Sequence, residues 1–267
     1  MSGYTLALSP EEIGRYRIMA EMARSVEAAQ WESAGIRPGA TVADVGCGPG
    51  AVTVAMAEVV GPSGSVVGVD GDAGAVAAAE KLIASVGVTN ASVREGRADE
   101  TGLEPGAFDV VVMRHVLAHN GGREQAIVDH LATLCRPGGS VYLIDVEMTA
   151  MRLTGIGPDL EDLGDRYVEF LRSRGNDPQV GLRLAELLGN AGLEVSDHRG
   201  FYNILSPQPG IRPPHWAARD AMVASGHASA ADLARWQAAF EALDAAGERP
   251  TIFAPLFSAT GRRPARG

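Results

Sequence analysis

The sequence predicts an α/β fold in which a mostly parallel sheet carries helices on both faces. The main observation is an alternation along the first half of the chain, where short apolar segments bounded by Gly, Pro, Asn or Asp take turns with alanine-rich helical segments. This rhythm is typical of βαβ units with right-handed crossovers. A second observation is that Val110–Met113 is apolar at every position, as expected for a strand buried on both faces.

Each element of this first half is predicted by its own pattern. Five strands are expected, at Thr41–Val45, Ser65–Val69, Ala91–Val93, Phe108–Met113 and Ser140–Val146. The helical segments between them are Ala51–Val60, Ala73–Val86 and Arg123–Leu134. An earlier helix is expected to begin after Ser9, a good capping residue, and its apolar residues keep helical spacing as far as Val26.

The alternation stops after Val146. Residues 147–177 are acidic and predict a helical insertion, and a helix over Gln179–Ala191 is expected to end at Gly192. The rest of the chain predicts strands around Leu193–Val195, Phe201–Leu205 and Thr251–Thr260, and helices over His215–Ala224 and Ala230–Ala246.

Composition narrows the classes of function. The 267 residues, 46% hydrophobic and 21% charged, are enough for one large α/β domain of a globular enzyme. A formal net charge of −10 disfavours nucleic acid as a partner. The two cysteines form no disulfide framework and lack the companions of a metal site. Since no apolar run of membrane-spanning length and no signal peptide is evident, we expect a cytoplasmic protein without a membrane partner, either a monomer or a homodimer.

The candidate ligand site is a glycine-rich turn, Gly46-Cys47-Gly48-Pro49-Gly50, between a strand and a helix. Glycines allow positive φ and close approach of a ligand, and free N–H groups at a helix start favour electron-rich groups. Asp70 ends the next strand, where its carboxylate can accept the hydroxyls of a ribose. The turn also fits a dinucleotide pattern, so these residues alone leave an S-adenosylmethionine site and a nicotinamide dinucleotide site open.

Three segments resemble class I S-adenosylmethionine-dependent methyltransferases. Val42–Gly50 is similar to their first motif, including the acidic Asp44 before the glycines, Phe108–Met113 looks like their fourth strand, and Arg136–Gly139 resembles the turn before their fifth. The resemblance covers about residues 15–146, and the layout is similar to small-molecule enzymes of the ubiquinone/menaquinone-biosynthesis type. It implies a Rossmann-like, seven-stranded sheet, S-adenosyl-L-methionine as cofactor and a small-molecule acceptor.

With this resemblance, we expect the chain to be divided into four parts. Residues 1–36 would form an N-terminal helical lid and residues 37–146 the cofactor-binding core. Residues 147–177 would form a helical insertion after strand five that covers the substrate. Residues 178–267 would complete the core and add helices to the substrate pocket, which His215 and Trp216 are candidates to line.

Cofactor contacts follow from the family motifs. The resemblance implies that Gly46 and Gly48 hold the methionine moiety with support from Asp44, and that Asp70 binds the ribose. Further candidates lie in the same turn, after the second strand and on the lid: Cys47, Gly50, Gly71 and Tyr16.

The adenine contact departs from the family pattern, because Arg97 stands where the family usually has an aspartate. We expect Asp99 to take over this contact, with the backbone of Ala98 facing the ring. Arg114, after the fourth strand, is a candidate either for the carboxylate of the cofactor or for a salt bridge.

Candidate catalytic residues follow the fourth and fifth strands, because ligands of open α/β sheets bind beyond the carboxyl ends of the strands. Methyl transfer is an in-line displacement, for which the protein orients the acceptor and, for an acceptor of high pKa, removes a proton. Histidine suits proton transfer near neutral pH. His119, oriented by Asp145, is therefore the predicted base, and His115 is the second candidate.

Two alternatives remain. An NAD(P)-dependent oxidoreductase would use the same glycine turn, but it does not require the placement of Asp44 or the turn Arg136–Gly139. A non-catalytic cofactor-binding protein would keep the turn, but it would not need a candidate base or a lid.

Overall fold

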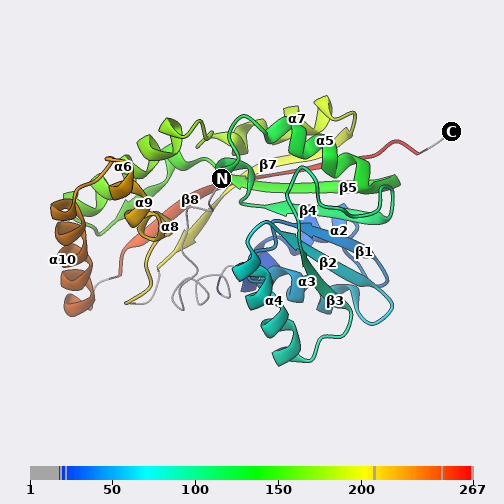
Figure 1. Cartoon of the computed structure of the whole chain (residues 1–267), viewed down its shortest axis with the longest axis horizontal. Coiled ribbons are helices and arrows are strands. Elements are labelled where there is room, and N and C mark those ends of the chain that lie inside the picture. The colour runs from blue at the N-terminus through cyan, green and yellow to red at the C-terminus, as the bar shows by residue number, and fades with distance from the viewer. Residues whose placement is uncertain (1–17, 19, 22, 207–208, 248, 266–267) are drawn as a thin grey trace.

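The structure is a computed structural model that describes residues 18–265 apart from 19, 22, 207–208 and 248 (Figure 1). Most of the helix expected after Ser9, including Tyr16, lies outside the described residues. A short helix, α2 (Ala28–Ala34), leads from the N-terminal region into the first strand and ends at Gly35, which adopts a left-handed conformation. No helix in the described part of the chain is long and apolar enough to cross a membrane.

A twisted sheet forms the centre of the molecule. Its parallel part has the order β3-β2-β1-β4-β5, and β8 pairs antiparallel with β5. The strand bounds, in chain order, are β1 (Thr41–Val45), β2 (Ser65–Asp70), β3 (Ala91–Glu95), β4 (Phe108–Arg114), β5 (Cys135–Val146), β6 (Arg152–Thr154), β7 (Glu194–Leu205) and β8 (Thr251–Arg262). The predicted fold class is thus confirmed, with eight strands in the described residues where seven were expected.

The strands differ from prediction in the antiparallel part. Two separate strands were expected around residues 193–195 and 201–205, but β7 is one continuous strand along β8. Gly200, which looks like an interruption in the sequence, is needed inside this strand because a Cβ there would lie 2.7 Å from the ring of Phe257. The short strand β6, which pairs with the start of β8, was not expected at all.

β5 also begins earlier than expected. Arg136–Gly139, expected as a turn before the strand, lies inside it. The register against β4 shifts there, since Phe108 pairs with Cys135 and Val110 with Ser140. Between these two pairs, residues 136–139 of β5 lie beside the single residue Asp109 of β4, which forms a bulge.

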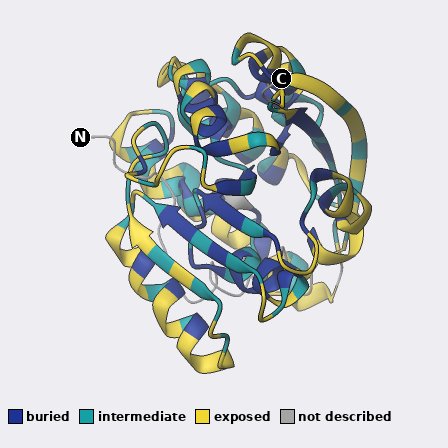
Figure 2. Cartoon of the chain, turned by 90° about the vertical axis from the view of Figure 1, so that its right-hand side faces the viewer, coloured by how far each residue is buried: buried dark blue, intermediate teal, exposed yellow. Residues whose placement is uncertain are grey.

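Helices lie on both faces of the sheet, and the strands between them are mostly buried (Figures 1 and 2). α3 (Ala51–Val60) and α4 (Ala73–Val86) pack on β2 and β3, whereas α5 (Glu124–Leu134) and α7 (Leu184–Asn190) pack on the strands from β4 to β8. As predicted, Val110–Met113 is buried completely in the middle of this core.

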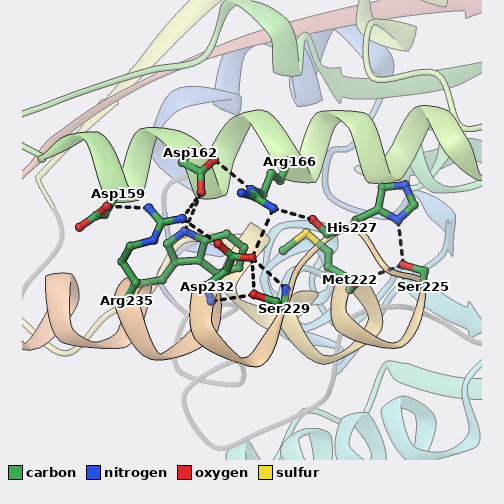
Figure 3. Close-up of polar contacts among 10 residues, drawn as sticks. Asp159, Asp162, Arg166, Met222, Ser225, His227, Ser229, Asp232 and Arg235 are labelled. Atoms are coloured by element: carbon green, nitrogen blue, oxygen red, sulfur yellow. Dashed lines mark hydrogen bonds and ion pairs between the residues drawn. The ribbon is translucent and has the colours of Figure 1, made fainter.

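Four helices form a second layer with a hydrophobic core of its own: α6 (Pro158–Ser173), α8 (Pro214–Ala217), α9 (Arg219–Ala224) and α10 (Ala230–Ala246). We call it the second helical layer. Arg235 on α10 binds Asp159 at 2.6 Å and Asp162 at 2.7 Å on α6, as Figure 3 shows. The expected insertion therefore does not pack alone, because its helix shares a core with helices some 60 residues later in the chain.

Candidate active site

The glycine turn follows β1 directly and has three left-handed residues. The φ angles are 79° at Gly46, 54° at Gly48 and 78° at Gly50, a region that favours glycine over every other residue. A Cβ on Gly46 would lie 2.3 Å from the Cγ2 atom of Val116, so the turn packs directly against the chain that leaves β4. The ends of β1 and β4 are therefore held together as one surface.

Asp70 links the end of β2 to this turn. Its Oδ2 atom accepts a hydrogen bond from the Gly48 N–H at 2.8 Å, and its Oδ1 atom accepts one from the Asp72 N–H at 2.9 Å. Partial burial raises the pKa of this carboxyl above its usual value. Each carboxylate oxygen keeps acceptor capacity for a ligand hydroxyl. The structure thus brings together the two features, turn and carboxylate, that the sequence predicted as a ribose site.

Asp44 and Cys47 have their side chains inside the protein. Asp44 accepts a hydrogen bond from the Thr53 hydroxyl at 2.6 Å, and burial raises its pKa to about 6. The Cys47 sulfur packs against Gly68 of β2, where a Cβ would lie only 2.9 Å away, and burial raises the pKa of the thiol well above its usual range. Asp44 thus braces the turn through α3, and a ligand would meet Cys47 through its backbone.

Arg114 forms a buried ion pair with Glu27, so the structure shows the second of the two roles considered for it. The Nη2 atom lies 2.5 Å from Oε1 of Glu27, and the two side chains are 9% and 2% exposed. Trp31 and Tyr142 also donate to Oε2 of Glu27, at 3.2 and 3.1 Å. The guanidinium is thus held by protein groups in this structure, and a contact with the carboxylate of the cofactor stays a prediction.

Asp145 stabilises the loop that carries the candidate histidines. Its hydrogen bonds come from backbone N–H groups, with Ala118 donating to Oδ2 at 3.2 Å and Val146 to Oδ1 at 2.9 Å. Ala118 belongs to a one-turn 3₁₀ helix, Leu117–His119. Asp145 is fully buried, and burial raises its pKa to about 6. The geometry makes Asp145 a positioning residue for this turn, and its expected pairing with the His119 imidazole stays a prediction.

His115 has an unusual backbone. Its φ of 56° makes it the only non-glycine residue with positive φ in the described part of the chain. Its N–H donates to the Ile144 carbonyl of β5 at 2.9 Å, which holds it at the carboxyl end of β4. Such strain is retained only where surrounding structure enforces it, and it is concentrated at functional sites. Among the candidate catalytic residues, His115 is therefore the one whose backbone carries an independent signal.

Asp99, the residue expected to contact the adenine, is paired with two arginines in the structure. The Asp99 carboxylate binds Arg97 at 3.0 Å and also pairs with Arg123, and the Arg97 guanidinium holds its pKa well below the usual range. Gly71 leads from Asp70 toward α4, and a Cβ there would have only the Gly96 carbonyl within 4 Å, at 3.8 Å. Cofactor contacts of the Gly71 and Ala98 backbone stay predictions. An adenine contact of the Asp99 carboxylate also stays a prediction, and it would have to form beside the ion pairs with Arg97 and Arg123.

Several residues around the site were missed by sequence reasoning. Thr53 on α3 contacts Asp44, and Glu27, the residue before α2, contacts Arg114; nothing in the local sequence marks either residue. Glu147, 5% exposed at the end of β5, accepts hydrogen bonds from Thr149 and Gln179. An acid directly after a predicted strand was the one available signal. No cluster of His, Cys, Asp or Glu that could hold a metal occurs among the described residues.

Comparison with known proteins supports the family resemblance. Residues 36–167 match a family described as a methyltransferase domain. The chain is 34% identical over 183 residues to the ubiquinone biosynthesis O-methyltransferase of Pseudomonas paraeruginosa, covering 66% of this chain and 73% of that protein. It is 37% identical over 123 residues to the nocamycin O-methyltransferase of Saccharothrix syringae, covering 46% and 44%. The chain spans about half the length of several other curated relatives that it matches.

Solved structures share the fold at low sequence identity. A SAM-dependent methyltransferase from Aquifex aeolicus superposes with a TM-score of 0.55 at 14% identity, covering 94% of this chain and 99% of that chain. The [4+2]-cyclase SpnF superposes with a TM-score of 0.58 at 19% identity, covering 92% and 82%. The fold is therefore shared by a methyltransferase and a cyclase, and the activity of this chain has to be argued from its site.

The buried ion pair makes a prediction about stability. Replacing Glu27 by Ala leaves the Arg114 guanidinium buried without its counter-charge, and we expect a loss of about 3–5 kcal/mol in the free energy of unfolding, measured with urea. Glu32→Ala, on the exposed side of α2, is the matched control and should change it by less than about 0.5 kcal/mol. The double variant Glu27→Met, Arg114→Met should be more stable than Glu27→Ala. If Glu27→Ala and Glu32→Ala lowered the free energy of unfolding equally, the ion pair would contribute nothing to stability and the prediction would be wrong.

The buried carboxyl of Asp145 makes a prediction about pH. Its pKa of about 6 in the folded protein lies above the ordinary 3.8, so the folded state binds more protons than the unfolded state between these values. Stability should therefore fall as pH rises from about 4 to about 6, by roughly 3 kcal/mol for this group. We expect the free energy of unfolding of Asp145→Asn, measured with urea at pH values from about 4 to about 6, to lack this contribution to the decline. An unchanged slope in the variant would show that Asp145 does not titrate as a buried group.

Proposed function

The chain belongs to the class I S-adenosylmethionine-dependent methyltransferases, and on this premise we propose that it transfers a methyl group to an O, N or C atom of a small molecule. S-adenosylmethionine supplies an electrophilic methyl group on a sulfonium centre, so the protein has to bind the donor, orient the acceptor and exclude water. The observation that carries the proposal is the contact between Asp70 and Gly48.

That contact distinguishes the two cofactor classes. A dinucleotide places its pyrophosphate on the free N–H groups of a glycine turn and helix start. Here the Gly48 N–H already donates to a carboxylate, and Asp44 lies buried beneath the same turn. A pyrophosphate would meet negative charge where it needs donors, whereas a sulfonium cation is favoured by the same field. The geometry therefore supports the methyl donor over NAD(P).

The turn also fits the donor sterically. Gly46, Gly48 and Gly50 have no Cβ, so their backbone can approach the methionine moiety closely. Asp70 at the end of β2 would accept the ribose hydroxyls. The bracing of the turn by Asp44, Thr53 and Val116 keeps this cradle formed before a ligand binds, which lowers the cost of binding.

The acceptor side would lie beyond the carboxyl ends of β4 and β5. We keep His119 and His115 as the candidate bases for an acceptor whose proton must be removed, and we assign Asp145 to positioning their loop. The relatives named as ubiquinone biosynthesis and nocamycin O-methyltransferases make oxygen the favoured acceptor atom. We further propose that the acceptor is a metabolite or natural product, and that the protein acts in the cytoplasm without nucleic acid as substrate.

The cofactor assignment is tested by calorimetry. S-adenosylhomocysteine should bind with one site per chain, and NADH should show no binding at the same concentrations. Asp70→Asn should weaken S-adenosylhomocysteine by about 10- to 100-fold, because hydrogen bonds to a charged acceptor contribute about 1.5–3 kcal/mol. Glu95→Gln, an exposed acid beside Asp70 in the register of β2 and β3, should leave the affinity unchanged. Binding of NADH alone would refute the proposal.

The candidate bases are tested by activity. His115→Gly keeps the left-handed backbone but removes the imidazole, and His119→Ala removes the second ring. A general base should cost about 10²- to 10⁴-fold in transfer of labelled methyl to a panel of phenols, with affinity for S-adenosylhomocysteine nearly unchanged. His198→Ala on β7 is the control. If a variant transfers methyl at the normal rate, the substituted histidine is not the base. If a variant loses only affinity for S-adenosylhomocysteine, the substituted histidine packs against the cofactor and takes no part in proton transfer.

A further inference from the structure

A cavity lies at the amino ends of the parallel strands, at the edge of the sheet opposite to the glycine turn. Its volume is about 220 Å³, and it is partly open to solvent. The segment between α2 and β1 forms one wall, and the starts of β4 and β5 and the end of β8 form the others. This volume is below the range typical of sites for drug-sized ligands, so a ligand held here would be compact.

The charged groups that line the cavity are three arginines and one aspartate, namely Arg37, Arg136, Arg262 and Asp109. Arg136 donates from Nε to Oδ1 of Asp109 at 2.6 Å. Arg262 donates from Nη2 to the carbonyl of Ser33 at 2.7 Å, an uncharged acceptor that leaves its positive charge unneutralised. Three guanidinium groups with one carboxylate make the cavity basic, although the whole chain has a formal net charge of −10.

Arg37 has all its hydrogen-bond donors available to a ligand. In the part of the chain that the structure describes, no residue forms a hydrogen bond or an ion pair with its guanidinium, and the residue is exposed. Its charge nevertheless acts on the cavity. Burial opposes ionisation of Asp109, but the Thr41 N–H and the charges of Arg136 and Arg37 together lower the pKa of this carboxyl. A guanidinium offers five N–H donors in a planar fork that matches the oxygens of a phosphate.

The backbone around the cavity leaves recognition to these side chains. Gly39 and Gly138 have left-handed φ angles of 87° and 78°, so the chain turns there without a side chain. Their N–H groups are already used, since Gly39 donates to the Val60 carbonyl at 2.8 Å and Gly138 to the Arg263 carbonyl at 2.9 Å. The donors that remain for a ligand are therefore those of cationic side chains, which favours an anion over a neutral molecule.

The cavity is separate from the site proposed for the methyl donor. Gly39 and Ala40 line it directly before β1, whereas the glycine turn begins with Gly46 directly after β1. At about 3.3 Å per residue of strand, the two places are roughly 20 Å apart. A ligand in the cavity would therefore neither overlap the donor nor reach the histidines that follow β4.

We propose that this cavity is a second ligand site, which binds a phosphate group, free or on a small phosphorylated molecule, through Arg37, Arg136 and Arg262. Arg37 supplies the unused donors, and the other two guanidinium groups add charge from β5 and β8. Asp109 holds Arg136 in place and is itself satisfied by the Thr41 N–H, at 2.8 Å. The inference goes beyond the proposed function, because methyl transfer requires no phosphate at this edge of the sheet.

Calorimetric titration with inorganic phosphate, glycerol 3-phosphate and glycerol tests the proposal. Both phosphates should bind with one site per chain and glycerol should not bind; the tighter of the two phosphates shows whether the site prefers a free phosphate or an ester. Arg37→Gln should weaken phosphate binding by about tenfold, the value of one charge-assisted hydrogen bond. Arg37→Lys, which keeps the charge but loses the planar fork, should fall between the two. Ionic strength is held constant because exposed charges are screened by salt.

Controls separate this site from general attraction of anions. Arg172→Gln, on the exposed side of α6, removes the same charge and should leave phosphate affinity unchanged. Saturating S-adenosylhomocysteine should also leave it unchanged, and thermal unfolding shows that each variant is folded. The proposal is wrong if neither phosphate binds, or if Arg37→Gln and Arg172→Gln weaken binding equally. It is also wrong if S-adenosylhomocysteine displaces the phosphate, which would then occupy the glycine turn.

Discussion

The buried ion pair between Arg114 and Glu27 is the interaction on which the site depends. It joins the segment before α2 to the end of β4, and the Tyr142 hydroxyl adds β5 to the same network. The Arg114 charge also acts on Asp44 and Asp145, whose pKa values burial raises to about 6. One guanidinium thus lies among three buried carboxylates. Without it their mutual repulsion and desolvation would oppose the close packing of the strand ends.

The same arrangement explains why this glycine turn suits a cation. Carboxylates of Asp44 and Asp70 lie under and beside the turn, and the nearby arginine is neutralised by Glu27. The local field is therefore negative at a place where many α/β proteins bind phosphate. Fold similarity alone does not decide this, since a methyltransferase and a [4+2]-cyclase superpose about equally well. Charge at the turn is what favours a sulfonium donor.

The first half of the fold was predictable because its signals are local. α3 and α4 have the expected bounds, and Asp70 meets the glycine turn because adjacent parallel strands end at one edge. The rest depends on contacts between distant residues. Glu27 reaches Arg114 across 87 positions, the ion pairs between α6 and α10 span 66 to 76 positions, and no local sequence pattern predicts either contact. Two strands were expected within residues 193–205, because neither the pairing of β7 with β8 nor the Phe257 ring that excludes a side chain at Gly200 is visible in the local sequence.

A crystal structure with bound S-adenosylhomocysteine tests the charge-based cofactor assignment. We expect the ribose hydroxyls to lie on the Asp70 carboxylate and the homocysteine moiety to lie along Gly46–Gly50. We also expect the Arg114–Glu27 pair to be intact and the sulfur to face the loop of His115 and His119. A ligand that displaces Glu27 to place its own carboxylate on Arg114, or that binds away from Asp70, would contradict the central claim.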